Sequence, residues 1–170
     1  IPIFIPNTIT NKEEFLNEIN VQGFILSGGD NINDNPERDS TEKAIIEFGI
    51  RNKIPLFGIC RGMQVINKFF GGKLHVTNNS KHVNTDHQID LTKDFPFCDK
   101  KSITVNSYHN NIIEIKDVGK NLKSFAIHQN DNTVEGFFHN ELPITGVMWH
   151  PERNPDENSI QLFQRIFSLE

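Results

Sequence analysis

The chain has 170 residues, of which 36% are hydrophobic and 23% are charged, and its formal net charge is −5. This balance is typical of one globular domain with a buried core and excludes a disordered chain. The acidic character argues against a large nucleic-acid-binding surface, and no apolar run approaches the ~20 residues of a membrane span.

The first half of the chain alternates short apolar runs with amphipathic segments. The apolar runs predict strands at residues 3–5, 23–27 and 55–59. The amphipathic segments predict helices at residues 11–19, 40–50 and 63–71. Thr10 is the expected cap of the first helix, and Asp39 or Ser40 that of the second, after a polar loop at residues 30–39. Strands that alternate with helices predict an α/β fold with a mostly parallel sheet.

The second half is richer in strands. We expect them at residues 73–77, 102–107, 124–129, 133–138 and 143–149. A helix at residues 156–168 closes the chain, and its apolar face includes Ile160, Phe163 and Ile166. No repeat or linker interrupts the sequence, so we expect a single domain over residues 1–170.

The stretch PLFGICRGMQ, residues 55–64, places a cysteine where a predicted strand gives way to a helix. Such a turn presents a nucleophile at the carboxyl end of a sheet, and a helix N-terminus lowers a thiol pKa. Gly58 and Gly62 remove side-chain bulk where strand and helix approach. Cys60 is therefore a candidate nucleophile, although a buried cysteine can also serve as a small core residue.

A thiol nucleophile needs a base, and one of the seven histidines stands in a suitable setting. His150, in WHPE at residues 149–152, follows an apolar strand, and Glu152 can reach back to orient its ring. The alternative is a surface histidine beside an unrelated glutamate. We expect Cys60, His150 and Glu152 to act as nucleophile, base and orienting group, because parallel strands bring their carboxyl ends together.

The segment SGGDN, residues 27–31, also follows a predicted strand. The backbone N–H groups of Gly28 and Gly29 could stabilise an oxyanion together with the N–H of Arg61. The alternative is an ordinary turn, because two successive glycines alone are weak support.

The motifs from SGGDN to HPE together resemble the class I glutamine amidotransferase superfamily. The resemblance implies a flavodoxin-like sheet with a nucleophile elbow. It also implies that Cys60 attacks a γ-glutamyl carbonyl to form a thioester, that His150 moves the proton and that Glu152 holds His150. Gln64 matches a family glutamine that contacts the glutamyl group, and its alternative role is an ordinary helix residue.

The segment VNSYHN, residues 105–110, is similar to the corresponding segment of the γ-glutamyl hydrolase branch. There it lies beside the substrate's α-amino and α-carboxylate groups, whereas the alternative here is a solvated loop. The resemblance implies substrate contacts from Asn106, Ser107, Tyr108 and His109.

Family members begin with a strand and a helix ahead of the segment matched by IPIFIP, residues 1–6. The chain starts inside a predicted strand and without a methionine. We therefore expect that a native N-terminal segment is missing from this sequence.

We expect no metal ion and no cofactor. His82 and His87, in KHVNTDHQI at residues 81–89, are five residues apart and could form a metal-binding pair. No cysteine or carboxylate cluster in the sequence completes such a site, so we reject the metal hypothesis.

The leading hypothesis is a stand-alone γ-glutamyl amide hydrolase with a small-molecule substrate. The two cysteines, Cys60 and Cys98, favour a reduced, cytoplasmic setting. The chain also resembles hydrolases of bacterial capsule phosphoramidate synthesis, which act on a γ-glutamyl nucleotide conjugate. A diphosphate could be contacted by Arg38, Arg61, Lys81 and Arg153. The alternatives are a glutaminase subunit that delivers ammonia to a synthetase partner, and a non-catalytic α/β scaffold.

Overall fold

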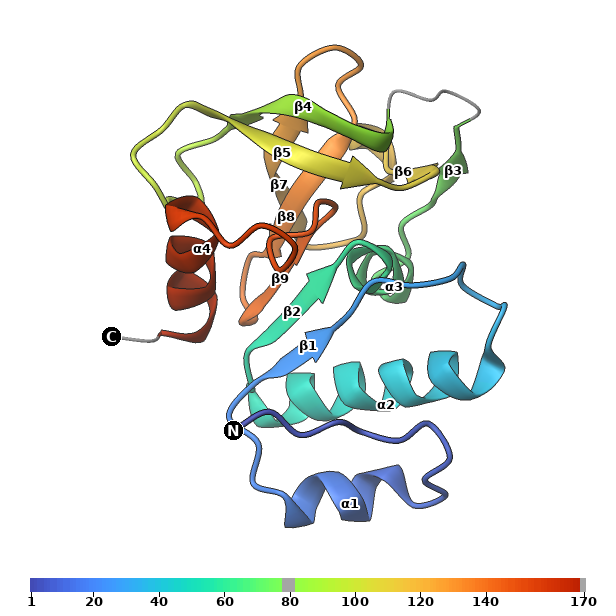
Figure 1. Ribbon diagram of the computed structural model, residues 1–170. Helices are drawn as coiled ribbons and strands as arrows, with labels where there is room; N and C mark the ends of the chain where they lie inside the picture. The colour runs from blue at the N-terminus through green and yellow to red at the C-terminus, as the bar shows by residue number, and fades with distance from the viewer. Residues whose placement is uncertain (78–81, 169–170) are drawn as a thin grey trace.

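Seven strands form one sheet in the computed structural model, which describes residues 1–77 and 82–168 (Figure 1). Their order across the sheet is β1-β2-β9-β8-β7-β4-β5. Three strands at one end run parallel to one another: β1 (Phe24–Leu26), β2 (Leu56–Ile59) and β9 (Ile144–Val147). The others pair antiparallel with their neighbours: β8 (Val134–His139), β7 (Leu122–His128), β4 (Val83–Leu91) and β5 (Ser102–Tyr108).

Helices cover both faces of the parallel end, as the alternating strand–helix pattern predicts. The helices are α1 (Lys12–Glu18), α2 (Pro36–Asn52), α3 (Arg61–Phe69) and α4 (Glu157–Phe167). A short 3₁₀ helix, η2 (Ile115–Asp117), and a small antiparallel pair, β3 (His75–Val76) with β6 (Asn111–Ile112), complete the described elements. The predicted α/β fold is confirmed, and the sheet is mixed: its parallel part is β1, β2 and β9, and the remaining pairings are antiparallel.

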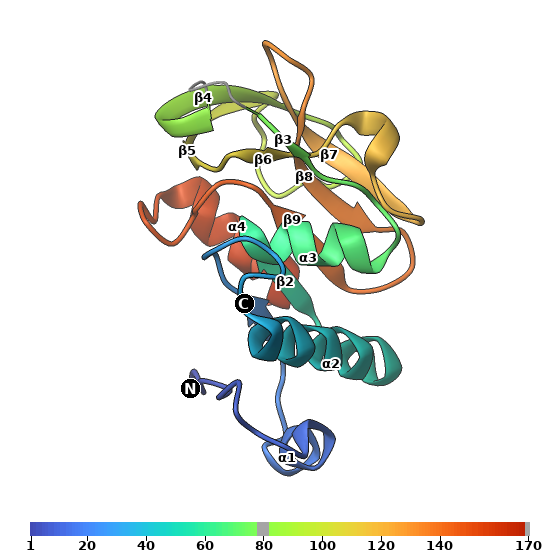
Figure 2. The same cartoon turned by 90° about the vertical axis from the view of Figure 1, so that its right-hand side faces the viewer.

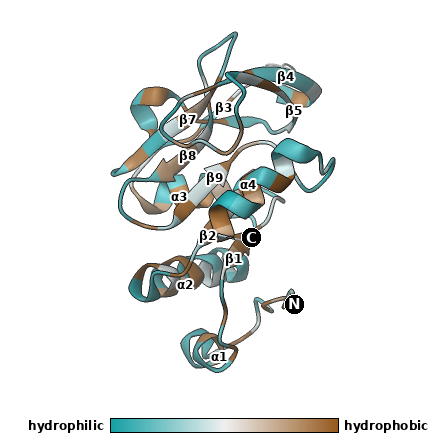
Figure 3. Cartoon of the chain, turned by 90° about the vertical axis from the view of Figure 1, so that its left-hand side faces the viewer, coloured by the Kyte–Doolittle hydropathy of each residue, from teal (hydrophilic) through white to brown (hydrophobic). Residues whose placement is uncertain are grey.

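The sheet separates two apolar clusters. One contains residues of α2 and α3, including Ile46, Met63 and Ile66, and the other contains Leu162 and Ile166 of α4. Figure 1 shows α4 on the opposite side of the sheet from α3, and Figure 2 shows α1 at the far end of the molecule from β4 and β5. In Figure 3, α4 carries both hydrophilic and hydrophobic residues, as expected of a helix with one face on the core.

Three helices begin elsewhere than the sequence predicts, and α3 does so at Arg61, two residues before its expected start at residue 63. α2 starts at Pro36, inside the expected polar loop, because the Asn35 side chain accepts a hydrogen bond from the Arg38 N–H and proline suits the first helical position. α1 is capped by Asn11 instead of Thr10. The first turns of α1 and α2 consist mainly of polar residues, so the apolar periodicity used to predict these helices does not mark where they begin.

The predicted strand at residues 3–5 does not form. No strand or bridge includes residues 1–6, and Ile1, Ile3 and Phe4 are exposed. Pro2 and Pro6 carry no backbone N–H, so this apolar segment offers few donors for pairing.

Three segments of functional interest converge where the parallel strands end. β1 leads into Gly28 and Gly29, β2 leads into Cys60, and β9 is followed within three residues by His150. Because β2 lies between β1 and β9 in parallel register, these strand ends are neighbours. Among the described residues, no helix is both long and apolar enough to cross a membrane.

Candidate active site

Cys60 occupies a strained turn between β2 and α3. Its φ of 51° and ψ of −104° lie in a region that residues with a side chain rarely adopt. Two backbone hydrogen bonds hold the turn, from Cys60 N to Val147 O at 2.8 Å and from Gln64 N to Cys60 O at 3.1 Å. This conformation agrees with the nucleophile elbow expected from the sequence.

The flanking glycines allow α3 to lie very close to β1 and β2. A Cβ atom at Gly62 would stand 2.1 Å from the carbonyl oxygen of Leu26, and one at Gly58 would stand 2.6 Å from the backbone of Gly62. Both contacts are shorter than atoms tolerate, so the close approach requires glycine at these two positions.

His150 connects Cys60 to Glu152. Cys60 is one of the groups that shift the pKa of His150, and Nδ1 of His150 donates to Oε1 of Glu152 at 2.7 Å. Burial lowers the pKa of His150, but the interactions with Cys60 and Glu152 outweigh it and raise the pKa to about 9. Burial raises the pKa of Glu152, but the hydrogen bond from His150 outweighs it and leaves the pKa below its usual value. Such an arrangement favours the imidazolium form of His150 beside the Glu152 carboxylate.

The predicted oxyanion-binding elements also border this group. A Cβ atom at Gly28 would stand 2.8 Å from Cε1 of His150 and 3.7 Å from Cβ of Cys60. Gly29 has a φ of +148°, which glycine adopts readily. Arg61 is the first residue of α3, so its N–H has no acceptor within the helix. These N–H groups therefore stay our candidates for an oxyanion site.

The side chain of Arg61 has a role that the sequence did not reveal. Its guanidinium is buried and forms ion pairs with Asp39 and Glu42 of α2. Arg38 also pairs with Glu42, at 2.8 Å, and donates to the carbonyl oxygens of Ser27 and Gly28. These two arginines hold α2, α3 and the glycine loop together, which corrects the expectation that they face a diphosphate.

Asn106 and Tyr108 both contact His150. The Asn106 amide bonds both backbone groups of His150: Nδ2 donates to its O at 2.9 Å, and Oδ1 accepts from its N–H at 2.8 Å. The Tyr108 ring lies edge-on to the His150 ring, with 5.8 Å between centroids, and carries the Arg153 guanidinium 4.2 Å from its own centroid. Asn106 therefore positions His150, while Tyr108 is still a candidate for contact with substrate.

Ser107 and His109 face away from this site. Successive side chains of a strand point to opposite faces, so they turn from the face of Asn106 and Tyr108. The buried Ser107 hydroxyl donates to the carbonyl oxygen of His82 at 2.8 Å, and His109 is buried beside Glu135. These contacts are at odds with the expectation that Ser107 and His109 bind substrate.

Gln64 lies in the first turns of α3, four residues after Cys60. Its side chain is buried, and Oε1 accepts a hydrogen bond from the Asn111 side chain at 3.1 Å. The Asn111 amide also donates to Oδ1 of Asn31, near the glycine loop, at 3.1 Å. Gln64 is thus oriented beside the candidate site, as contact with a bound glutamyl group would require.

A pocket of about 430 Å³ lies beside His150. Its walls include Asn106, Tyr108, Arg153 and Asp156, whereas Cys60 and the glycine pair do not line it. The pocket is therefore adjacent to the candidate nucleophile and could receive a part of a ligand that extends past His150.

Comparison with known proteins identifies the family. A family model described as "Glutamine amidotransferase class-I" matches residues 2–168. The chain belongs to the class I glutamine amidotransferase family. It is 36% identical over 155 residues to the gamma-glutamyl-CDP-amidate hydrolase of Campylobacter jejuni, a match that covers 88% of this chain and 71% of that protein.

Other relatives of this class I amidotransferase carry different names. It is 30% identical over 168 residues to a glutamine-hydrolyzing GMP synthase subunit of Methanococcus aeolicus, covering 95% of this chain and 80% of that one. A solved structure described as "a putative gmp synthase subunit a protein" from Thermoplasma acidophilum matches with a TM-score of 0.76 and 23% identity, over 96% of this chain and 78% of that chain. The match to the T. acidophilum structure supports the predicted fold.

The antiparallel half of the sheet contains a buried group that the sequence did not reveal. We call it the histidine–glutamate cluster: His82, His87, His109, His128 and Glu135. It supplies the carboxylate whose apparent absence led us to reject a metal site. Glu135 is the charged residue in the otherwise apolar run VEGFF, and a charge in such a run was the available sequence signal for a buried polar group.

Proposed function

We propose that this chain is a hydrolase that cleaves a γ-glutamyl amide bond through Cys60, His150 and Glu152. One arrangement carries the proposal: a cysteine at positive φ before a helix, which interacts with a histidine that a carboxylate orients. Family membership supports amide hydrolysis as the reaction class. The raised pKa of His150 supports an imidazolium in the resting site, which can give its proton to the leaving nitrogen.

In the first half-reaction, the Cys60 thiolate forms a bond to the γ-carbonyl carbon. The carbonyl oxygen becomes an oxyanion, which the N–H of Arg61 and those of Gly28 and Gly29 are placed to stabilise. The His150 imidazolium then donates its proton to the leaving nitrogen as the C–N bond breaks. A thioester between Cys60 and the glutamyl group is left, and the amine departs.

In the second half-reaction, water replaces the amine. Neutral His150 takes a proton from the water as its oxygen attacks the thioester carbon. The C–S bond breaks, glutamate is released, and the thiolate returns to its pairing with the imidazolium. Glu152 keeps the same His150 tautomer throughout, because its carboxylate accepts the Nδ1 proton.

The proposed leaving group is a nucleotide amidate of the CDP-amidate type, as the name of the C. jejuni relative suggests, and capsule synthesis would be its setting. Of the four cations first considered for a diphosphate, Arg38 and Arg61 pair with carboxylates, and Lys81 lies outside the described residues. Arg153 is therefore the remaining candidate of the four for contact with a diphosphate. It lines the pocket beside His150 and stacks on Tyr108. A free thiol nucleophile also fits a reducing, cytoplasmic compartment.

The test is glutamate release from glutamine, simple γ-glutamyl amines and a γ-glutamyl nucleotide amidate. We expect Cys60-dependent turnover, fastest with the nucleotide conjugate. Cys60→Ala should abolish it, and Cys98→Ala is the matched control because Cys98 lies outside the site and should leave turnover unchanged. No Cys60-dependent turnover of any γ-glutamyl compound would refute the proposal.

The second candidate function is a glutaminase subunit that passes ammonia to a synthetase. Relatives whose names include GMP synthase and carbamoyl phosphate synthase small chain favour it. This function predicts slow turnover of free glutamine that rises when a synthetase partner is added, and no preference for conjugates.

A further inference from the structure

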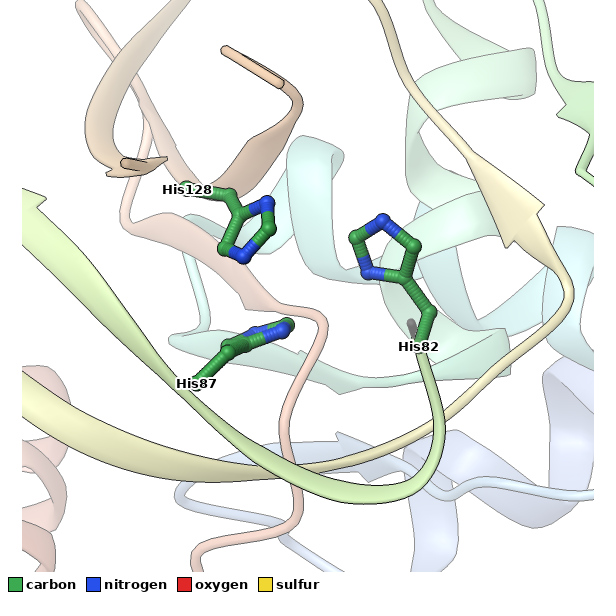
Figure 4. A group of neighbouring side chains, drawn as sticks. All are labelled: His82, His87 and His128. Atoms are coloured by element: carbon green, nitrogen blue, oxygen red, sulfur yellow. The ribbon is translucent and has the colours of Figure 1, made fainter. Parts of the chain in front are cut away.

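The histidine–glutamate cluster lies inside the antiparallel half of the sheet, apart from Cys60 and His150. His87 comes from β4, His128 from the end of β7 and Glu135 from β8, while His82 precedes β4 and His109 follows β5. All five side chains are more than nine-tenths buried. In Figure 4, the rings of His82, His87 and His128 converge on one space between the strands.

The Glu135 carboxylate lies at the centre of the group without a hydrogen-bond donor. Its Oε1 is 3.9 Å from Nδ1 of His82 and 3.5 Å from Nε2 of His109, and its Oε2 is 3.4 Å from Nε2 of His87. None of these atoms has a hydrogen-bond partner. A buried carboxylate without a partner costs several kcal/mol, so this geometry calls for a compensating positive charge.

The outer nitrogens of two rings show which inner nitrogens carry lone pairs. Nδ1 of His109 lies 2.9 Å from the Asn111 carbonyl oxygen, which can only accept, so this nitrogen carries the proton. Nε2 of His82 lies 2.8 Å from an Asp131 carboxylate oxygen, which also accepts. In neutral rings, Nε2 of His109 and Nδ1 of His82 therefore present lone pairs to Oε1 of Glu135.

A nitrogen lone pair and a carboxylate oxygen that face each other repel unless a cation lies between the two atoms. Imidazoles that bind metal ions commonly donate their other N–H to a carboxylate or a backbone carbonyl, as His82 and His109 do here. In tetrahedral zinc sites the metal–nitrogen and metal–oxygen bonds are about 2.0–2.2 Å, which separates neighbouring ligand atoms by ~3.3–3.6 Å. From Oε1 of Glu135, the separation of 3.5 Å to Nε2 of His109 falls within this range, and the separation of 3.9 Å to Nδ1 of His82 is slightly wider.

We propose that His82, His109 and Glu135 bind one divalent transition-metal ion, with Zn²⁺ the best match. Two imidazoles and one carboxylate suit zinc, whereas Mg²⁺ and Ca²⁺ require mainly oxygen ligands. His128 supports the site from outside: its Nδ1 is bonded to Asp131 at 2.6 Å, and its ring packs 4.3 Å from that of His87. The three ligand atoms lie within 4.8 Å of one another, and Nε2 of His87 lies beside them, 3.4 Å from Oε2 of Glu135.

The ion would stabilise the strands that lie beside the candidate active site. His109 bonds the Asn111 carbonyl, and the Asn111 side chain bonds Gln64. His82 accepts a hydrogen bond from Ser107 at its carbonyl oxygen, and Ser107 is the neighbour of Asn106, which holds His150. The inference is independent of the proposed reaction, because the ion touches neither Cys60 nor His150.

The test is the metal content of the purified full-length chain, measured by mass spectrometry after expression in zinc-supplemented medium without chelators. We expect about one zinc ion per chain, and in a chelator-stripped sample refilled with Co²⁺, the visible absorption bands of tetrahedral cobalt. Glu135→Gln should greatly reduce both signals. The control is His75→Gln, which alters a second, more exposed group, His75, Glu114 and Asp117, and should change neither signal.

Two outcomes would overturn the inference. The first is a folded wild-type chain with no stoichiometric metal and no tetrahedral cobalt spectrum. The second is loss of metal from His75→Gln but not from Glu135→Gln, which would assign the ion to the other group. Because the first outcome is read from the wild-type chain, the inference can be refuted even if Glu135→Gln fails to fold.

Discussion

The Asn106 side chain binds both backbone polar groups of His150, through hydrogen bonds of 2.9 Å to its carbonyl oxygen and 2.8 Å from its N–H. Asn106 belongs to β5, at the edge of the antiparallel half, while His150 follows β9 of the parallel half. The two halves of the sheet therefore meet at the proposed base, which makes the position of His150 dependent on β5.

Replacing Asn106 by leucine, which is similar in size, removes both bonds and should displace His150. A displacement of about 1 Å can reduce a rate by about 100-fold. We expect kcat to fall by roughly this factor while KM changes little, because His150 moves protons and is not proposed to bind the substrate. Asn140→Leu, at an exposed position, is the control. A rise in KM at constant kcat would instead indicate that Asn106 contacts the substrate.

Gly28→Ala should impair activity without unfolding the chain. The new methyl group would stand 2.8 Å from Cε1 of His150, so the ring must move away from Cys60. We expect a large loss of glutamate release and an unchanged circular dichroism spectrum.

Gly49→Ala is the matched control in α2, and it carries a prediction of its own. A methyl group there meets its nearest neighbours at 3.6 Å, which is ordinary contact. Alanine in a helix interior should raise the free energy of unfolding by about 0.5–1 kcal/mol, as measured by urea denaturation, and leave activity intact. Equal activity losses in both variants would contradict the contact between Gly28 and His150.

The stability that His150 contributes should decline in alkaline solution. Its folded-state pKa is raised from 6.5 to about 9, so the folded chain holds this proton more tightly than the unfolded chain does. The contribution is fully present below pH 6.5 and is lost as the pH rises through about 9. The difference in unfolding free energy between wild type and His150→Gln should shrink over this range.

The same pKa can be followed directly by NMR titration of the His150 ring. Cys60→Ala and Glu152→Gln should each lower it, because each removes a group that stabilises the imidazolium. An unchanged pKa in Cys60→Ala would mean that the thiol and the imidazole do not interact.

Arg61→Met should destabilise the fold, because it leaves the buried Glu42 carboxylate without its Arg61 partner. Loss of one partner of a buried ion pair costs about 3–5 kcal/mol, which urea denaturation would detect. The double variant Arg61→Met with Glu42→Leu should recover much of this loss. If Arg61→Met is fully stable but binds a nucleotide conjugate poorly, the side chain serves the substrate after all.

The sequence by itself determined the elements that local patterns encode. Apolar runs beside helical segments predicted β1, β2, β9 and α3, and the short motifs around Cys60 and His150 predicted a site where those strands end. Parallel strands necessarily bring their carboxyl ends together, so local information was sufficient for this half of the molecule.

Only the tertiary structure decided which polar side chains face each other across the antiparallel half. Side chains of β5 alternate between two faces, which sends Asn106 to His150 and Ser107 to the interior, and His109, just after β5, lies buried beside Glu135. Glu135 and His87 lie on different strands, far apart in the sequence, and their meeting depends on strand order and register. Those depend on long-range pairing of whole strands, which no short motif encodes.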